Sequence, residues 1–275
     1  MMRKWFITGI SSGLGQAMAR LVMEMGDYVV GTFRQHTQAA VFNREHKGKG
    51  EAVVLDITDA NRMADVVEEI TKRHGQIDVL VNNAGVGFIG AIEEASLPEV
   101  RSVFEANFFG ALQLTQILLP GMRSRKQGTI VQISSHGGIK AFAGFGVYNA
   151  SKFALEGASE AMAQELAPLG IRVLLVEPGP FRTAFAGNGL QEASAAIADY
   201  NETAGAFRHM LRDVHGRQEG DPHKAAMAIY DTVTSGTDNL RLPLGKTALK
   251  TIQMKLDSVQ HDLDAGRKVA EMVVF

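Results

Sequence analysis

The sequence predicts a doubly wound α/β fold, in which helices cover both faces of a parallel sheet in three layers, α/β/α. The first observation is an apolar run at 5–8, a glycine loop, an amphipathic helix to about Met25 and a second apolar run at 28–33. The second is that apolar runs continue to alternate with helical segments as far as residue 176. Connections of helical length between strands favour parallel pairing, so the sheet is predicted to be parallel.

The other elements are predicted in chain order. Residues 35–50 are polar and basic, and we expect a surface loop there. Further strands are predicted at 51–56, 77–81, 128–133, 171–176 and, as a last edge strand, 239–244. Helices are predicted at 60–74, 99–124, 148–167 and 222–235. Together they form a single domain over 1–275, with a helical insertion at about 184–220 and a charged amphipathic extension at about 246–275.

Composition excludes several classes of protein. The chain has 275 residues, of which 45% are hydrophobic, and its 28 Lys and Arg against 30 Asp and Glu lack the basic footprint of a nucleic-acid binder. Cysteine is absent and the eight histidines show no close ligand pairing, so we expect no metal site. No apolar run approaches the ~20 residues of a membrane span, and none resembles a signal peptide. We therefore expect a cytoplasmic protein without membrane or nucleic-acid partners.

A glycine-rich loop follows the first strand. Its sequence is Gly9-Ile10-Ser11-Ser12-Gly13-Leu14-Gly15, with the spacing G-x3-G-x-G rather than the more common G-x-G-x-x-G. Glycines let the backbone approach a pyrophosphate, and the N–H groups and dipole of the helix start favour its charge. A glycine cluster could be a plain turn, but the flanking strand and helix favour phosphate binding.

The end of the second strand selects between dinucleotides. A carboxylate there binds a ribose 2′-hydroxyl, whereas a guanidinium accommodates a 2′-phosphate. This chain has Phe33-Arg34 and no carboxylate. Since Arg34 can pair with a phosphate in forked geometry, NADP(H) is predicted to be preferred, with NAD(H) possible. The alternative is a solvated arginine, and Ser12 supplies no second basic partner.

Polar residues also end the third and fourth strands. Asp56 could accept from an adenine amino group, or it could cap the next helix, as could Asp59. The fourth strand is closed by Asn82-Asn83-Ala84-Gly85. There the amides can satisfy strand-end backbone groups while the small residues admit a cofactor.

The stretch from Ser134 to Lys152 carries the predicted chemistry. Tyr148 and Lys152 are four residues apart and lie on one face of the predicted helix. A free phenol has a pKa of about 10, and a nearby ammonium lowers it by favouring the phenolate. Ser135, at a strand end, could donate to the same substrate oxygen. The alternative for the Tyr–Lys pair alone is a solvated helix face.

Asn107 lies inside a predicted helix, although asparagine competes for backbone groups there and is a poor helix-interior residue. It either kinks the helix and places a polar group near the site, or faces water. His136 adjoins the serine pair, and we assign it a structural or substrate-edge role.

In combination, these motifs resemble the short-chain dehydrogenase/reductase family, which has a Rossmann fold. The resemblance covers residues 3–184 and rests on Thr8–Gly15, Asn82–Gly85, Asn107, Ser135 with Tyr148-x-x-x-Lys152, and Pro178-Gly179 with Thr183. The glycine loop, Thr32-Phe33-Arg34 and the C-terminal tail are similar to bacterial relatives of the 17β-hydroxysteroid and retinol dehydrogenases.

The resemblance implies a role for each site residue. Tyr148 would be the acid/base, Ser135 would orient the substrate oxygen, and Lys152 would lower the phenol pKa and bind the nicotinamide ribose. Asn107 would hold a water that extends a proton relay. The remaining cofactor contacts would come from Asp56, Ile57, Asn83, Ala84, Gly85, Pro178, Gly179, Phe181 and Thr183. Phe181 departs from the usual Val or Ile, which puts only the local shape in doubt. Hydride would pass directly between nicotinamide and substrate without a metal.

The predicted function is that of an NADP(H)-dependent oxidoreductase that interconverts a secondary alcohol and a ketone, or a primary alcohol and an aldehyde. The insertion at 184–220 would form a lid over a bulky apolar substrate, with Ser135, Phe142, Phe145 and Phe185 in contact. Val86, Phe88, Tyr200, Phe207 and Met210 could line the same pocket or pack in the core. The alternative function is a catalytically silent NADP(H) sensor. The family resemblance also implies a homodimer or homotetramer formed through the helices at 99–124 and 148–167.

Overall fold

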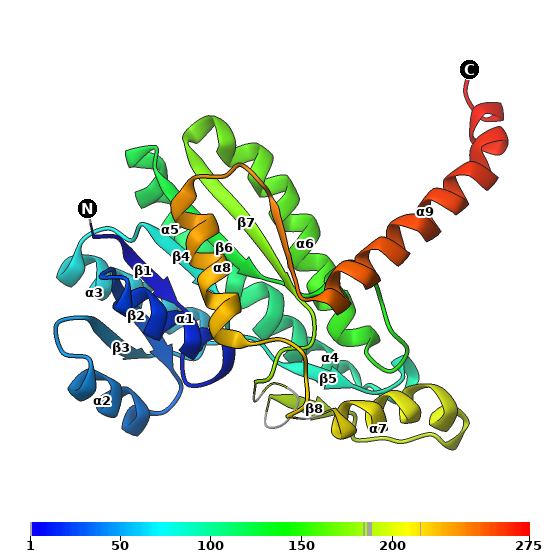
Figure 1. Cartoon of the computed structure of the whole chain (residues 1–275), viewed down its shortest axis with the longest axis horizontal. Coiled ribbons are helices and arrows are strands. Elements are labelled where there is room, and N and C mark those ends of the chain that lie inside the picture. The colour runs from blue at the N-terminus through cyan, green and yellow to red at the C-terminus, as the bar shows by residue number, and fades with distance from the viewer. Residues whose placement is uncertain (1, 184, 186–188, 215) are drawn as a thin grey trace.

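A computed structural model describes residues 2–183, 185, 189–214 and 216–275 of the protein. The main sheet consists of β1 (Lys4–Ile7), β2 (Tyr28–Phe33), β3 (Gly50–Val54), β4 (Val79–Asn82), β6 (Gly128–Ile133), β7 (Ile171–Pro178) and β9 (Arg241–Leu244). Its strands are all parallel, in the order β3-β2-β1-β4-β6-β7-β9 (Figure 1). The strand order reverses between β1 and β4, which confirms the doubly wound α/β fold and predicts a ligand site at the carboxyl ends there.

Helices cover both faces of this sheet, as expected for strands that are apolar on both sides. Trp5 and Ile7 of β1 pack with α1 (Gly13–Glu24) and α8 (Pro222–Ser235) on one face. Phe6 points the other way and packs with α3 (Ala60–His74), α5 (Gly110–Arg125) and α6 (Gly146–Leu166). The side chains of Trp5, Phe6 and Ile7 are completely buried. Successive side chains of β1 therefore contribute to the hydrophobic cores on opposite faces of the sheet.

Two parts of the fold differ from the sequence prediction. The expected loop at 35–50 contains helix α2 (His36–Glu45), which buries only Ala39 and so has almost no apolar periodicity. Asn43 secures it by two hydrogen bonds with the backbone of Ala52 on β3. The structure also has a small parallel sheet of β5 (Gly87–Ile89) and β8 (Leu190–Glu192), whose strands are too short to stand out in the sequence.

The helix predicted at 99–124 is interrupted. Helix α4 (Leu97–Phe104), capped by Ser96 and Glu99, passes into a π-helical turn at Glu105–Phe109 before α5 begins. Asn107 lies in this turn and is 1% exposed. The alternative in which Asn107 faces water is therefore wrong, and the interruption expected at this position is present.

The last third of the chain forms the insertion and the extension. Helix α7 (Ala206–Asp213) follows β8, and α8 returns the chain to edge strand β9. Helix α9 (Lys246–Met272) then leaves the body of the molecule (Figure 1). Among the described residues, no helix has both the length and the apolarity that a membrane crossing would need.

Candidate active site

Strand β6 delivers Ser135 to the carboxyl edge of the sheet. Its backbone is extended, with φ −168°, and it caps a short 3₁₀ turn at His136–Gly138. The Ser135 Oγ accepts a hydrogen bond from the N–H of Gly137 at 2.9 Å, which fixes the rotamer of the serine. The serine is therefore held beside the next helix rather than free in solvent.

Tyr148 and Lys152 project from the first turns of α6 toward the same place. The Nζ of Lys152 lies 5.9 Å from the centroid of the Tyr148 ring and donates to the carbonyl of Ile133 at 2.8 Å. Both side chains are buried, and Ser135 lies close enough to the Tyr148 hydroxyl to act on its pKa. The structure thus brings the three predicted catalytic residues together, and the alternative of a solvated helix face is wrong.

Burial controls the proton affinities of this group. It raises the pKa of Tyr148 to about 12, although hydrogen bonding to Ser135 acts in the opposite direction. It lowers the pKa of Lys152 to about 8, against a smaller raising effect of Glu156. The lowering of the Tyr148 pKa expected from Lys152 is therefore not found in the protein alone, because the cost of burying a phenolate is larger.

Asn107 joins this group from the π turn. Its side chain bonds both backbone groups of Val86, and its Nδ2 also donates to Ser151 Oγ on α6 at 3.0 Å. The amide is therefore used within the protein. A Cβ atom placed on Gly85 would lie 2.9 Å from Asn107 Oδ1 and 3.7 Å from Lys152 Nζ, so only glycine fits at this point.

The glycine loop has the features that a pyrophosphate requires. Gly9 and Gly13 adopt left-handed φ values of +70° and +61°, which other residues rarely take. Ser12 is the N-cap of α1 but makes no side-chain cap, and the first turn holds no acidic residue. The N–H groups at this helix start therefore remain available to an anion. Ser11 and Ser12 are exposed, and Leu14 packs against the core.

The loop after β4 is tied to this glycine loop. Asn83 Nδ2 donates to the carbonyls of Thr8 and Gly9 at 2.8 and 3.1 Å, and Thr8 Oγ1 accepts from the N–H groups of Asn83 and Ala84 at 3.0 and 2.9 Å. The predicted cofactor residues around Gly9 thus form one connected edge. Asn82 serves the fold instead, donating to Thr115 at 2.9 Å.

The other predicted cofactor residues are spread around this edge. Thr183 reaches the loop, since a Cβ on Gly13 would lie 3.3 Å from it. Gly179 bonds the carbonyl of Leu244 on β9, beside Pro178 in the same pairing, and the ring of Phe181 covers Gly220. These contacts place the Pro178–Phe181 segment against the body of the fold.

Arg34 and Asp56 follow strands β2 and β3. Arg34 is exposed at the end of β2. The preceding residue, Phe33, lines a cavity of about 340 Å³ together with Ser11 and Thr37. Asp56 accepts from the N–H and hydroxyl of Thr58, so it forms a local turn, and Asp59 caps α3 instead. Asp56 and the neighbouring Ile57 lie just beyond the carboxyl end of β3.

Aromatic side chains surround the ring of Tyr148. Its ring stacks on Phe145 with centroids 4.3 Å apart, and Phe185 lies 5.7 Å away. Phe142 packs with His136 and, through Phe207, with Phe145. The three phenylalanines predicted to contact substrate therefore gather near the phenol. Phe88 is a core residue, whereas Met210 is exposed.

His136 has a structural contact. Its Nδ1 lies 2.8 Å from Thr251 Oγ1 of α9, and burial lowers its pKa to about 4. A neutral ring that holds the first turns of α9 agrees with the structural role predicted for it.

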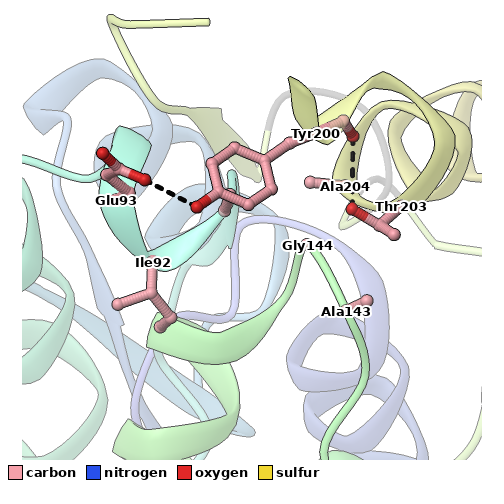
Figure 2. A pocket seen from close by; sticks show the side chains of 8 residues that line it. Ile92, Glu93, Ala143, Gly144, Tyr200, Thr203 and Ala204 are labelled. Atoms are coloured by element: carbon pink, nitrogen blue, oxygen red, sulfur yellow. Dashed lines mark hydrogen bonds between the residues drawn. The ribbon is translucent and has the colours of Figure 1, made fainter. Parts of the chain in front are cut away.

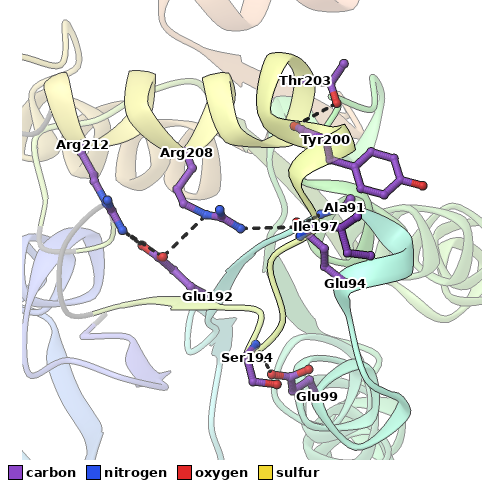
Figure 3. Close-up of polar contacts among 10 residues, drawn as sticks. All are labelled: Ala91, Glu94, Glu99, Glu192, Ser194, Ile197, Tyr200, Thr203, Arg208 and Arg212. Carbon is purple, nitrogen blue, oxygen red and sulfur yellow. Dashed lines mark hydrogen bonds and ion pairs between the residues drawn. The ribbon is translucent and has the colours of Figure 1, made fainter.

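Two glutamates and two arginines hold the insertion, and no sequence pattern indicates their contacts. Buried Glu94 accepts from the N–H groups of Ala91 and Ile197 and pairs with Arg208, as Figure 3 shows. Arg208 and Arg212 both pair with Glu192 of β8. Because Ile197 and Arg208 are 103 and 114 residues from Glu94 in sequence, only the folded chain reveals these two contacts.

The insertion also borders an open cavity of about 470 Å³, lined by Ile92, Gly144, Tyr200 and Ala204 among others (Figure 2). The Tyr200 hydroxyl donates to Glu93 at 2.6 Å across its rim. Tyr200 therefore lines this cavity.

Known proteins resemble the chain over most of its length. A 3-ketodihydrosphingosine reductase of Bacteroides thetaiotaomicron is 38% identical over 87% of this chain and 86% of its own. Human retinol dehydrogenase 8 is 37% identical over 78% of this chain and 69% of its own. A crystal structure of a short-chain dehydrogenase from Streptomyces avermitilis is 41% identical, covers 100% of both chains and superposes with a TM-score of 0.94.

Related folds have been solved with cofactor. A Burkholderia phymatum short-chain dehydrogenase/reductase in complex with NAD is 20% identical, with a TM-score of 0.84 over 95% of both chains. A metagenomic short-chain oxidoreductase in complex with NADP is 27% identical, with a TM-score of 0.69 over 88% of this chain and 96% of its own. Residues 3–193 match the short chain dehydrogenase family as a whole. The chain therefore belongs to that family and is an oxidoreductase that acts on CH–OH groups.

Proposed function

We propose that this protein is an NADP(H)-dependent oxidoreductase that interconverts a ketone and a secondary alcohol, or an aldehyde and a primary alcohol, with a bulky apolar substituent. The observation that carries the proposal is the buried group of Ser135, Tyr148 and Lys152 at the carboxyl edge of the sheet. Burial of titratable groups that nothing else in the fold requires is typical of catalytic sites.

The cofactor would lie along the edge from Arg34 to Thr183. The uncapped start of α1 would hold the pyrophosphate, Arg34 the 2′-phosphate, and Asp56 and Asn83 the adenosine side. When bound, the nicotinamide supplies the hydride that is exchanged with the substrate carbon. The small residues Ala84 and Gly85 leave room along this edge.

The chain's own side chains manage the proton. In reduction, the Tyr148 hydroxyl donates its proton to the oxygen of the new alcohol, and in oxidation it takes the proton back. Ser135, fixed by Gly137, hydrogen-bonds the same oxygen. Lys152 places a positive charge near the phenolate that reduction leaves behind, which offsets part of the cost of burying it. Asn107 holds α6 and the loop after β4 in register for this exchange.

The apolar surroundings favour a bulky apolar substrate. Phe142, Phe145 and Phe185 lie on the side of the Tyr148 phenol, and Leu190 of the insertion packs in the same cluster. Two of the similar relatives are named for retinol and for 3-ketodihydrosphingosine, which are molecules with long apolar chains.

We further propose that the protein is a single domain, that it is located in the cytoplasm and that it forms homo-oligomers.

A carbonyl panel with both cofactors tests the proposal. NADPH absorbance is followed with short and long-chain ketones and aldehydes, and Tyr148→Phe, which keeps the ring but removes the proton, is the matched control. We expect turnover of long-chain substrates by the native protein and its loss by about 100-fold or more in the variant, with NADPH binding retained. Undiminished turnover in Tyr148→Phe would exclude the assigned proton donor.

The second candidate is a catalytically silent NADP(H) sensor. It is disfavoured because the hydroxyl, phenol and ammonium stand together in a buried site, which a sensor does not need. Cofactor binding without turnover of any carbonyl in the panel, or of the corresponding alcohols with NADP, would favour the sensor.

A further inference from the structure

Helix α9 carries a surface that the proposed activity does not use. Its first turns are anchored, because Ala248 is completely buried and Thr251 contacts His136. From Leu256 to Met272 every residue is exposed, and the helix stands clear of the body (Figure 1). Most helical stability in proteins comes from packing an amphipathic face, and this part of α9 packs against nothing in the described chain.

An apolar stripe runs along α9 with alternating spacings of three and four residues. It consists of Leu249, Ile252, Leu256, Val259, Leu263, Gly266 and Ala270, and Val273 continues the spacing just after the helix. Leu249, Leu256 and Leu263 expose 58%, 56% and 59% of their surface, although leucine is usually buried. Such spacing, kept over about three heptads, is the pattern of a coiled coil.

The charges that flank the stripe complement a second copy of the same helix. In a parallel pair, Asp262, just before Leu263, would face Arg267, just after Gly266, on the other copy. In an antiparallel pair in which Leu256 packs on Val259, Asp262 would face Lys255. Opposite charges therefore meet in either direction, and each contact occurs twice by symmetry.

The polar face argues against a lipid surface as the occupant. A membrane-surface helix is rich in Lys and Arg on its polar side. Helix α9 instead mixes acidic and basic residues, with Lys246, Lys250, Lys255, Arg267 and Lys268 against Asp257, Asp262, Asp264 and Glu271. This near balance of charges is typical of the solvent-facing side of a helix in a coiled coil. Gly266 has no atom within 4 Å of a Cβ built on it, so a partner helix can approach it closely.

We propose that the α9 stripe packs against the same stripe of a second copy of this chain, so that α9 is an oligomerisation helix. This contact is distinct from the helices at 99–124 and 148–167, through which the family resemblance implies association. The contact involves none of Ser135, Tyr148 and Lys152. A test can therefore exclude it without excluding the proposed activity, and the reverse is also true.

The first test compares two matched double variants of the full chain. Leu256→Lys with Leu263→Lys places two charges on the stripe, whereas Met254→Lys with Ala265→Lys places them on the opposite, exposed face. We expect light scattering to give the stripe variant half the particle mass of the native protein. We also expect the amide hydrogens of residues 256–272 to exchange faster in this variant than in the native protein. The control should keep the native mass and protection, and both variants should keep NADPH oxidation.

The second test uses the absence of cysteine, because introduced thiols are then the only ones in the chain. Leu263→Cys alone should form a disulfide-linked dimer if the helices run parallel, and Leu256→Cys with Val259→Cys should do so if they run antiparallel. Cross-linking with an unchanged mass in the first test still supports the pairing, within an assembly that a second interface also holds. No cross-link in either cysteine variant, or binding to phosphatidylcholine–phosphatidylglycerol vesicles that only the stripe variant loses, overturns the proposal.

Discussion

Asn107 and Val86 are joined by two hydrogen bonds: the Val86 N–H donates to Asn107 Oδ1 at 2.7 Å, and Asn107 Nδ2 donates to the Val86 carbonyl at 2.8 Å. The same Nδ2 reaches Ser151 on α6. One buried amide thus connects the π turn, the loop after β4 and the helix that carries Tyr148 and Lys152. Its replacement by an apolar group would leave several buried partners unpaired.

Replacement of Asn107 by Ala should therefore lower both stability and activity. We expect a loss of about 2–4 kcal/mol in the free energy of unfolding, measured in urea, because each unpaired buried group costs about 1–3 kcal/mol. Asn43→Ala is the matched control, since Asn43 makes the same double contact with Ala52 far from the site. Activity retained by Asn107→Ala where it is fully folded would remove its positioning role.

Asn107 also illustrates what the sequence could decide. An asparagine within an apolar helical run indicates one of two arrangements. Either the helix is interrupted there or the residue faces water, because each arrangement gives the side-chain amide hydrogen-bond partners. The choice depends on Val86 and Ser151, which belong to other elements. Ser135, Tyr148 and Lys152 could be predicted because a strand end and one helix face place them. The pKa of Tyr148 could not, because burial decides it and depends on the whole fold.

The buried Lys152 should lower stability at neutral pH. Its pKa falls to about 8 in the folded chain from 10.5, so the cost of burying the ammonium is fully present below pH 8. Between those values the unfolded chain holds the proton and the folded chain does not, so this contribution to stability rises with pH. Lys152→Met should thus abolish activity yet raise the free energy of unfolding at pH 7 by about 1–3 kcal/mol.

Urea unfolding at pH 7 and pH 10 checks this expectation. The gain from Lys152→Met should shrink at the higher pH, whereas Lys72→Met, at an exposed position on α3, should leave the midpoint unchanged at both. If Lys152→Met lowers stability at pH 7, the hydrogen bond to the Ile133 carbonyl outweighs the burial cost.

Glu94 should control the order of the insertion. The N–H of Ile197, then that of Ala91 and the charge of Arg208, lower the pKa of Glu94 below its ordinary value. A lowered pKa means that the carboxylate contributes stability above its unfolded value of 4.5 and loses it as the pH falls through the folded value. Glu94→Gln should speed amide exchange over 190–212 at pH 7. Glu202→Gln, an exposed carboxylate in the same insertion, should not.

The insertion marks the limit of sequence reasoning about this fold. The central strands could be predicted because Trp5–Ile7 and their parallel neighbours are continuously apolar. The insertion is held instead by charges such as Glu94 and Arg208, and by strands of only three residues, β5 and β8. Neither leaves a periodic pattern, because the partners are distant in sequence and each contact involves single residues.

Arg34 is the residue on which the cofactor preference depends. It is exposed at the end of β2, and a charged hydrogen bond to a 2′-phosphate is worth about 1.5–3 kcal/mol. Arg34→Ala should therefore lower kcat/KM for NADPH by about 10- to 100-fold and leave NADH unaffected, because NADH has no phosphate at that position. Arg44→Ala, an exposed arginine of α2, controls for the loss of general positive charge. If Arg34→Ala keeps its preference for NADPH, Arg34 does not bind the 2′-phosphate, and the serines of the glycine loop become the candidates for that role. Equal loss with both cofactors would instead show that Arg34 shapes the adenosine site without reading the phosphate.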